Sequence, residues 1–432
     1  MKTLSERDQS VVWHPFTQHK TSPISIAIKR AEGVYLYDEN DKQYIDAISS
    51  WWVNIHGHAH PYIAQKVYEQ FLKLEQVIFA GFTHEPAIEL AEKILTHLPD
   101  NQSKIFYSDN GSTAVEVALK MAIQYFYNQG NTQKKKIIAL ENAYHGDTFG
   151  TMSVGAKSSF NAPFDEFLFD VIYLKLPPVG SEKDCIADMK TIMTYADEIA
   201  GFVFEPLVQG AGGMIMYSPE LLDELIGIAQ KNNIICIADE IMTGFFRTGK
   251  MFATDFLANN KPDVFCLSKG LTGGAMAMGI TSCTQAIFQA FLSDQKAKTL
   301  FHSHSFTANP LACVAGLASL ELLFTAETQE NIARITRRHQ HFMMYFLEKK
   351  MPFLREIRQQ GTILALEIET GESTSYFHSI RDIAYNYFIE KGILLRPLGN
   401  IIYILAPYCI SDDDLDKVYT TIESFFDFLN EN

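Results

Sequence analysis

The sequence lacks long hydrophobic runs and has a deficit of positive charge. No apolar segment among its 432 residues is long enough to span a bilayer. The first residues, 1–7, lack the apolar stretch of a signal peptide. The formal net charge of -15 disfavours nucleic acid or an anionic membrane as the main partner. We therefore expect a soluble cytoplasmic protein, in which one local arginine could still bind an anionic small molecule.

Cysteine is also scarce and unpatterned. The chain has 6 cysteines, and no two of them show the CxxC spacing of a metal or redox motif. Most lie in apolar runs, which is typical of buried free thiols in a reducing compartment and not of a disulfide framework.

The length and the pattern of apolar runs predict two domains with an α/β fold. A chain of 432 residues is too long for one small core. Short apolar runs alternate with helical stretches, which favours a wound, mostly parallel sheet. The expected strands are 105–108, 137–140, 171–174, 202–205, 234–239 and 264–268.

The pattern changes near both ends of the chain. Long helices are expected at 311–324 and 330–349, followed by short strands at 362–368, 393–396 and 401–405 and a last helix at 413–429. A hairpin at 34–37 and 43–46 is expected to pack with this carboxyl-terminal part. We predict a small domain from 1–50 and 315–432 and a large domain from 51–314.

Two of the expected strands end on side chains with complementary chemistry, Asp239 and Lys269. Ligands of parallel sheets bind at the carboxyl ends of the strands, so both side chains are expected at one crevice. A lysine can form a Schiff base, and an aspartate can keep a pyridinium nitrogen protonated. Both are requirements of pyridoxal 5'-phosphate (PLP) chemistry. The alternative is a structural salt bridge between the two.

Gly111 and Ser112 lie between an expected strand and the helical pattern that begins at Ala114. Free backbone N–H groups at a helix start form a phosphate site. The alternative is that Ser112 or Thr113 only caps the helix.

Tyr144 and Glu205 also follow expected strands. An aromatic ring in the place of Tyr144 can stack on a flat cofactor, although core packing is the alternative. Glu205 is expected to hydrogen-bond near the cofactor.

The histidines suggest a rival from another class of protein. Alternating histidines at His56, His58 and His60 and at His302 and His304 could hold zinc for a hydrolase. Gly57 and Pro61 make a regular strand doubtful there, so we predict no metal site.

Taken together, these motifs resemble the class III aminotransferases of PLP fold-type I. The likeness runs from Trp13 to Gly399 and is greatest to members that aminate 8-amino-7-oxononanoate (KAPA) in biotin biosynthesis. It is carried by Ser49-Ser50-Trp51-Trp52, Tyr144-His145-Gly146-Asp147-Thr148, Gln209-Gly210-Ala211-Gly212-Gly213-Met214, Ala238-Asp239-Glu240-Ile241, Ser268-Lys269-Gly270, and Arg247 together with Arg396.

The resemblance implies a large domain with a mostly parallel seven-stranded sheet and a smaller α/β domain from both chain ends. It implies that Lys269 is the catalytic residue that attaches PLP, that Asp239 meets the pyridine nitrogen, and that Tyr144 is part of the catalytic site. Gly111 and Ser112 would bind the phosphate.

The resemblance also implies a homodimer with active sites at the subunit boundary. Ser305 would supply a phosphate-binding hydroxyl to the other subunit, beside His304, and Ser303 would lie near the substrate. The family usually has threonine where this chain has Ser305.

The implied reaction is ping-pong amino transfer from S-adenosyl-L-methionine to KAPA, which gives 7,8-diaminononanoate. Arg396 would bind the distant carboxylate of KAPA, and Arg247 would bind the carboxylate of the donor. The apolar groove would be lined by Phe16, Trp51, Trp52 and Tyr144. Because adjacent strand residues face opposite ways, we expect Trp51 to contact substrate and Trp52 to be core.

Phe16 departs from the pattern of the adenosylmethionine-using members, which generally carry tyrosine there. Some relatives that take the amino group from lysine have phenylalanine, so lysine is the alternative donor. A further alternative is a class III enzyme for an ω-amino acid such as ornithine or 4-aminobutyrate, against which the paired tryptophans and Arg396 argue.

Overall fold

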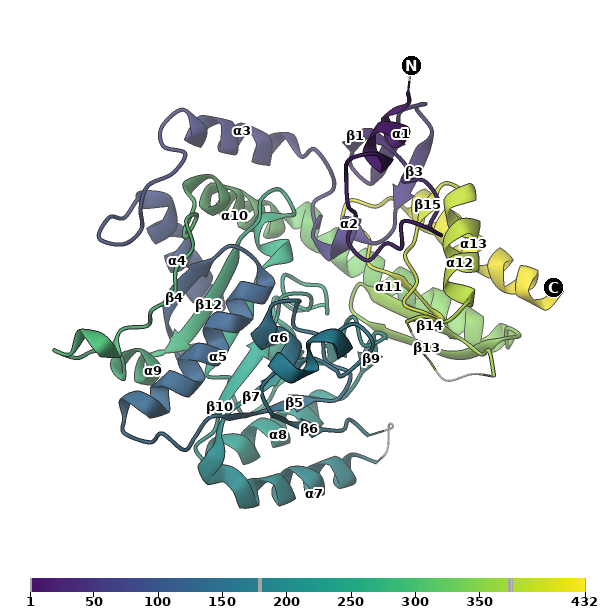
Figure 1. The fold of residues 1–432 in the computed structure, drawn as a ribbon. Helices are drawn as coiled ribbons and strands as arrows, with labels where there is room; N and C mark the ends of the chain where they lie inside the picture. The colour runs from purple at the N-terminus through teal and green to yellow at the C-terminus, as the bar shows by residue number, and fades with distance from the viewer. Residues whose placement is uncertain (1, 178–180, 372–373, 375, 432) are drawn as a thin grey trace.

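The protein is described by a computed structural model at residues 2–177, 181–371, 374 and 376–431. Its largest element is a seven-stranded sheet (Figure 1). Every neighbouring pair is parallel except those of β12, which runs antiparallel to both neighbours. In spatial order the strands are β4 (Gln102–Ser108), β12 (Gly279–Thr284), β11 (Val264–Leu267), β10 (Ile235–Asp239), β7 (Ile199–Phe204), β5 (Lys136–Leu140) and β6 (Val171–Leu174). The predicted mostly parallel seven-stranded sheet is confirmed.

Helices cover both faces of this sheet because its strands are apolar on both sides. Along β10, Cys236 and Ala238 join the core that includes α8, while Ile235 and Ile237 join the core that includes α5. Alternate strand residues point to opposite faces, so the unbroken apolar run is what a sandwiched strand requires. The helices of this part are α3 (Pro61–Phe71), α4 (Glu85–His97), α5 (Gly111–Asn128), α6 (Phe149–Val154), α7 (Glu182–Ile192), α8 (Pro219–Lys231), α9 (Gln285–Gln289) and α10 (Pro310–Leu323), with the short pair β8 (Val208–Gln209) and β9 (Ile215–Met216).

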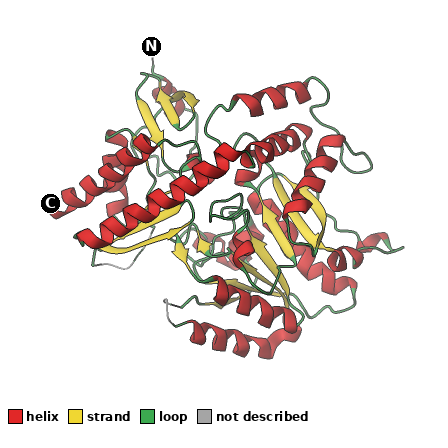
Figure 2. Cartoon of the chain, turned by 180° about the vertical axis from the view of Figure 1, so that it is seen from behind, coloured by secondary structure: helices red, strands yellow, loops and turns green. Residues whose placement is uncertain are grey.

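The two chain ends meet in a second part of the molecule, which Figure 2 shows from behind. Strand β15 (Ile393–Leu394) pairs in parallel with β3 (Gln43–Asp46), which follows β1 (Ile28–Glu32) and β2 (Tyr35–Asp38) in the same sheet. The expected packing of the amino-terminal hairpin with the carboxyl-terminal part is confirmed. A second, antiparallel sheet contains β13 (Leu354–Gln360), β14 (Ile363–Ile368) and β16 (Ile401–Ile404), and the helices are α1 (Leu4–Gln9), α11 (Ala326–Lys349), α12 (Ile380–Glu390) and α13 (Asp412–Glu431). The domain boundaries after residues 50 and 314 stay predictions, and α10 continues across the second.

Strand β12 is absent from the strands that the sequence pattern predicts. Its residues Thr281 and Ser282 are polar yet fully buried. The hydroxyl of Thr281 donates to the carbonyl oxygen of Ala114 at 2.7 Å, and that of Ser282 donates to Oε1 of Gln102 at 2.7 Å. Partners more than 160 residues away in the sequence therefore compensate for the burial.

Two expectations from composition concern the thiols and the apolar helices. All six cysteines are free, five of them buried and Cys409 exposed. No single helix within the described ranges is long and apolar enough to cross a membrane. Helices α10 and α11 satisfy the length and composition only as a pair, across a bend of 70°.

Candidate active site

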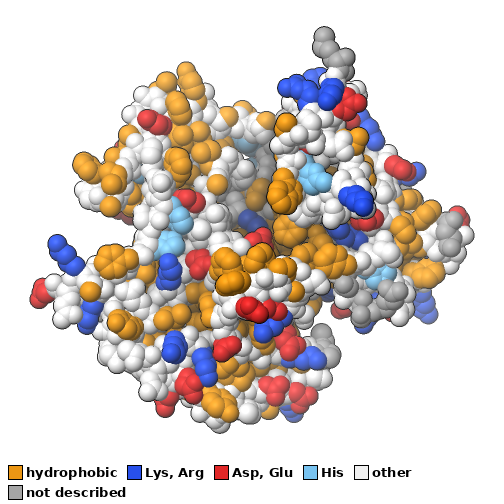
Figure 3. Space-filling model, viewed as in Figure 1, with side chains coloured by type: hydrophobic (Ala, Val, Ile, Leu, Met, Phe, Trp, Pro, Cys, Tyr) orange, Lys and Arg blue, Asp and Glu red, His pale blue; other side chains and the backbone are white. Residues whose placement is uncertain are grey.

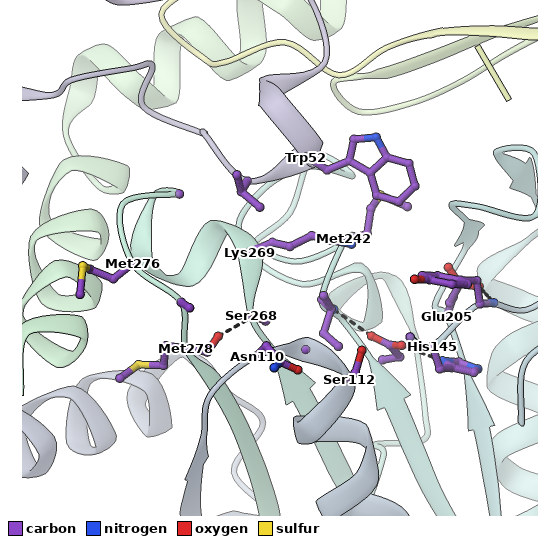
Figure 4. Close-up of a pocket in the computed structure, with 18 of the residues that line it drawn as sticks. Trp52, Asn110, Ser112, His145, Glu205, Met242, Ser268, Lys269, Met276 and Met278 are labelled. Atoms are coloured by element: carbon purple, nitrogen blue, oxygen red, sulfur yellow. Dashed lines mark hydrogen bonds and ion pairs between the residues drawn. The ribbon is translucent and has the colours of Figure 1, made fainter. Parts of the chain in front are cut away.

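A cavity of about 430 Å³ opens at the carboxyl ends of the central strands. Figure 3 shows the hollow between the two parts of the molecule, and Figure 4 shows the side chains that line it. The structure brings many of the predicted site residues together here. Those in the lining are Trp52, Gly111, Ser112, Tyr144, Glu205, Asp239 and Lys269.

Lys269 follows β11 and begins a short 3-10 helix, with φ at 47°. Desolvation of the partly buried amine lowers its pKa to about 8, and the charge of Arg247 adds to this effect, while Asp239 and Glu205 oppose it. A lowered pKa increases the fraction of neutral, nucleophilic amine near neutral pH.

Asp239 is paired with a histidine rather than with Lys269. Its Oδ2 lies 2.7 Å from Nδ1 of His145, and its Oδ1 accepts from the backbone N–H of Ile241 at 3.1 Å. Burial would lower the pKa of His145, but the hydrogen bond and charge of Asp239, with the charge of Glu205, raise it overall. The alternative of a structural salt bridge between Lys269 and Asp239 is therefore not what the structure contains.

The N-terminus of α5 faces the same cavity. Asn110 is the N-cap, because its side chain accepts from the N–H of Thr113 at 3.0 Å. Gly111 and Ser112 then form the first turn, where backbone N–H groups have no carbonyl partner in the helix. Thr113 is not the N-cap but belongs to the capping box, since its hydroxyl accepts from the N–H of Asn110 at 3.1 Å. The turn fits an anionic group. Gly146, with φ at 130°, completes this corner, since a Cβ there would lie 1.9 Å from Oγ of Ser112.

Tyr144 is held at the cavity wall by one hydrogen bond from its backbone and one from its side chain. Its backbone N–H donates to Oε1 of Glu205 at 3.0 Å, and its hydroxyl donates to Oδ2 of Asp147 at 3.0 Å. Glu205 also accepts from the N–H of Gly210 at 2.9 Å, and burial is the main cause that raises the pKa of Glu205 to about 7. Glu205 therefore holds the loops of Tyr144 and Gly210 in place. It also lies in the cavity wall, as expected.

The outer part of the site is aromatic and carries a cation. The ring of Trp51 lies 5.7 Å from the ring of Phe16, and the guanidinium carbon of Arg396 lies 5.0 Å from the Trp51 ring centre. Phe160, which the sequence analysis did not single out, contacts Phe16 at 5.9 Å between ring centres. It comes from the loop after α6 and also packs on Tyr376.

The expectation that Trp51 and Trp52 lie in a strand is wrong. They lie in a short turn, α2 (Ser49–Trp52), with φ values of 52°, 62° and 68° at Ser49, Ser50 and Trp52. The turn still separates the two rings, because Trp51 is 44% exposed and Trp52 only 5%. Trp52 is nevertheless part of the cavity wall as well as the core.

Arg247 does not reach the cavity surface in this structure. It is fully buried, and its Nη1 donates to the carbonyl oxygen of Ala406 at 2.8 Å. Its Nε and Nη2 find no hydrogen-bond partner within the described residues. These two nitrogen atoms of a buried cation can donate to an anion.

Ser303, His304 and Ser305 lie on the loop before α10 and are absent from the cavity lining. Nε2 of His304 is 2.9 Å from Nε2 of His302, and the carbonyl oxygen of Ser305 accepts from the side chain of Gln76 at 2.8 Å. Ser303 and Ser305 are exposed, so one chain alone does not bring them to Lys269.

Most histidines of the rival zinc hypothesis have other partners. Nε2 of His56 is 3.1 Å from Oγ of Ser319, and Nε2 of His58 is 2.7 Å from Oδ2 of Asp46. Across the part of the chain that the structure describes, no three His, Cys, Asp or Glu side chains are grouped as metal ligands.

Comparisons with known proteins agree with this geometry. The model of the family described as aminotransferase class-III matches residues 16–426. The adenosylmethionine-8-amino-7-oxononanoate aminotransferase of Synechococcus elongatus is 42% identical over 96% of this chain and 98% of its own. A crystal structure of the enzyme of that name from Methanocaldococcus jannaschii has a TM-score of 0.91 at 34% identity and covers 98% of both chains. An amine transaminase from an uncultivated Pseudomonas species, solved in a PLP-bound form, has a TM-score of 0.89 at 26% identity, over 96% of this chain and 98% of its own.

Proposed function

Since this chain belongs to the class III aminotransferases, we propose that it transfers an amino group from S-adenosyl-L-methionine to KAPA. The product would be 7,8-diaminononanoate, an intermediate of biotin biosynthesis, and the cofactor is PLP. The observation that carries this proposal is the 42% identity, over nearly the full length, to a relative named for this reaction.

The residues around the cavity fit PLP. Bound PLP supplies an aldehyde that takes up an amino group and a pyridinium ring that accepts electrons. The amine of Lys269 would hold it covalently, and Asp239, backed by His145, would meet the ring nitrogen. The first turn of α5, with Gly111 and Ser112, would bind its phosphate. The Tyr144 ring would lie against its face.

Lys269 would also move the proton on which the reaction depends. Its Nζ would take the proton from the substrate carbon and return it to the cofactor side. Such general acid–base assistance is worth about 10²–10⁴-fold in rate. A pKa of about 8 keeps both protonation states of the amine accessible near neutral pH.

The acceptor proposal depends on the aromatic outer part of the site. KAPA is a long aliphatic acid, so it needs an apolar channel that ends in a cation. Arg396 over the ring of Trp51, beside Phe16, offers both. We add Phe160 to the predicted channel residues because it contacts Phe16. A guanidinium can bind the carboxylate with two parallel hydrogen bonds.

Donor identity has a second candidate. The unused Nε and Nη2 of Arg247 would suit the carboxylate of either adenosylmethionine or lysine, once the buried side chain becomes accessible. Phe16 lacks the hydroxyl expected of adenosylmethionine-using members, and this observation favours lysine. We keep adenosylmethionine as the proposal because of the relatives' name.

We also propose a cytoplasmic homodimer, with small molecules rather than nucleic acid or membranes as its ligands. The loop with Ser303, His304 and Ser305 would complete the partner's site, with Ser305 donating to the phosphate. Large apolar side chains are exposed around this loop and the segment that follows α3, namely Phe71, Leu72, Ile78, Phe82, Phe301 and Phe306. Hydrophobic side chains gather over the region of α3 and α4 in Figure 3. Exposed apolar side chains in these segments suit contact with a second copy of the chain.

Single-turnover assays of the PLP-loaded enzyme would test the proposal. Adenosylmethionine, lysine and ornithine are added separately, and loss of the PLP absorbance is followed before KAPA is supplied. Conversion by adenosylmethionine, followed by formation of diaminononanoate, is the expected result. Conversion by lysine alone would replace the donor, and failure of KAPA to accept would overturn the proposed function. Lys269→Ala, which should bind PLP without turnover, is the control.

A further inference from the structure

The turn that carries Trp52 is held in an unfavourable backbone conformation. Three hydrogen bonds stabilise it, one at each of three consecutive residues. Oδ2 of Asp46 accepts from the N–H of Ser50 at 2.6 Å, Oδ1 accepts from the N–H of Ile48 at 3.1 Å, and the hydroxyl of Ser49 donates to the carbonyl oxygen of Leu405 at 2.7 Å. Positive φ values at non-glycine residues cost free energy and persist only where surrounding contacts determine them. The contacts around this turn therefore fix where Trp52 points.

The indole of Trp52 has one hydrogen bond of its own. Nε1–H donates to the hydroxyl of Tyr403 at 3.0 Å, and the two rings meet edge to face with centres 6.0 Å apart. Tyr403 lies on β16 and is 2% exposed, and burial raises its pKa above its usual range. Its hydroxyl thus stays neutral and can accept from the indole at all physiological pH values. The smaller part of the molecule sets the angle of this ring.

The face of the indole is directed at the catalytic amine. Nζ of Lys269 lies over the ring of Trp52, 4.6 Å from its centre, and Figure 4 shows both side chains in the cavity. Ammonium groups within about 6 Å of a tryptophan centre are attracted by the ring electrons. The charged groups that act on Lys269 from the other elements are Asp239, Glu205 and Arg247. Asp239 is engaged with His145 and Glu205 with backbone N–H groups, whereas the face of the indole is turned to Nζ.

We propose that Tyr403 is a positioning residue. Its hydroxyl fixes the indole of Trp52 so that the ring face binds the ammonium form of Lys269 whenever that nitrogen is not bonded to the cofactor. This inference rests on the proposed attachment of PLP to Lys269. The amine must leave the cofactor in each half-reaction, and the indole would then keep its proton near the substrate carbon. The contact with the indole would offset part of the free-energy cost of desolvating the charged amine.

The test measures the pKa of Lys269 directly in the protein without PLP. The rate at which an amine-specific acylating reagent modifies residue 269 is followed against pH, with the labelled peptide quantified by mass spectrometry. Trp52→Leu should lower the pKa by about one unit, and Tyr403→Phe by about half a unit, if a cation–π contact of ordinary strength is lost or loosened. Tyr419→Phe is the matched control, because it removes another buried hydroxyl, bonded to His339 at 2.6 Å and without contact to Trp52. It should leave the pKa unchanged.

A second experiment, in the Trp52→Phe variant, distinguishes positioning of the indole by Tyr403 from a general loosening of the packing around it. Trp52→Phe keeps an aromatic face but has no N–H to donate, so adding Tyr403→Phe to it should cause no further shift in the Lys269 pKa. An equal shift in both backgrounds would show that Tyr403 acts by another route and would overturn the proposal. An unchanged pKa in Trp52→Leu would overturn it as well. Neither result concerns the transferred group or its donor, so failure here is distinguishable from failure of the proposed function.

Discussion

Nδ1 of His145 and Oδ2 of Asp239 are 2.7 Å apart in a pair that is almost fully buried. The two residues come from the ends of β5 and β10, which β7 separates in the sheet. Removing one member of a buried charged pair leaves the other without its partner, which is costly. We therefore predict that His145, which has no step of its own in the reaction, controls how tightly the cofactor binds.

His145→Ala is expected to weaken PLP binding by about tenfold to a hundredfold, because a hydrogen bond to a charged group is worth about 1.5–3 kcal/mol. Titration of the cofactor-free protein with PLP, followed by absorbance, measures the Kd. His339→Ala serves as the control, since it removes a buried histidine bonded to Tyr419 in the smaller part. It should reduce the free energy of unfolding without changing the Kd. A PLP affinity in His145→Ala equal to that of the wild type would refute the assignment.

Arg396→Ala is expected to lower kcat/KM for KAPA by about tenfold to a hundredfold while sparing the donor half-reaction, because only the acceptor carboxylate would lose its partner. The two half-reactions are measured separately by stopped-flow absorbance. Arg396→Lys should fall between the wild type and Arg396→Ala, since it keeps the charge but not the planar fork. Arg30→Ala is the control, as this arginine also lies over an aromatic ring, 3.5 Å from the Tyr37 ring centre, but on β1. Equal loss in both half-reactions would contradict the role of Arg396.

Phe16→Tyr is expected to improve the use of adenosylmethionine by roughly fivefold, about the worth of one hydrogen bond. The measurement is the donor half-reaction with adenosylmethionine and with lysine. Phe160→Tyr adds a hydroxyl to the neighbouring ring and should not change the preference between donors. If Phe16→Tyr leaves the preference unchanged as well, position 16 does not select the donor.

The stability of the cofactor-free protein should depend on pH through Lys269. Burial lowers the pKa of this amine to about 8, whereas the unfolded chain has the ordinary value of 10.5. Between these values the unfolded chain binds more protons, so stability rises with pH from 8 to 10.5. Below pH 8 the cost to the folded state is fully present, at about 3 kcal/mol.

Lys269→Met removes the charge while keeping a side chain of similar length. Urea unfolding should therefore find Lys269→Met more stable than the wild type near pH 7.5, with the difference shrinking towards pH 10.5. A difference that stays constant over this range would mean that the amine is not desolvated in the folded protein.

The sequence was most informative where function depends on residues that end apolar strands. Lys269 and Asp239 could be placed at one edge of a sheet because β11 and β10 are short, apolar and adjacent in register. The same reasoning placed Tyr144 and Glu205, which follow β5 and β7. In each case the local pattern alone determines the element and its end.

The features that sequence reasoning missed depend on distant partners. His145 is tied to a carboxylate 94 residues away, which no local pattern indicates. The turn at Trp51 and Trp52 needs Asp46 and the carbonyl of Leu405, and two neighbouring aromatic residues do not reveal these partners. The resemblance assigns Arg247 to the donor carboxylate, but its guanidinium is buried and donates to the carbonyl oxygen of Ala406.

The pairing of β3 with β15 has a consequence for how the substrate range of this enzyme can evolve. Trp51 follows β3 and Arg396 follows β15, so two of the residues proposed to recognise the acceptor leave the same pair of hydrogen-bonded strands. Lys269, Asp239 and the α5 turn all belong to the other sheet and its helices. Substitutions at Trp51 and Arg396 would therefore alter which carbonyl compound is accepted without touching Lys269, Asp239 or the α5 turn, so that part of the substrate range can evolve separately from the transfer of nitrogen.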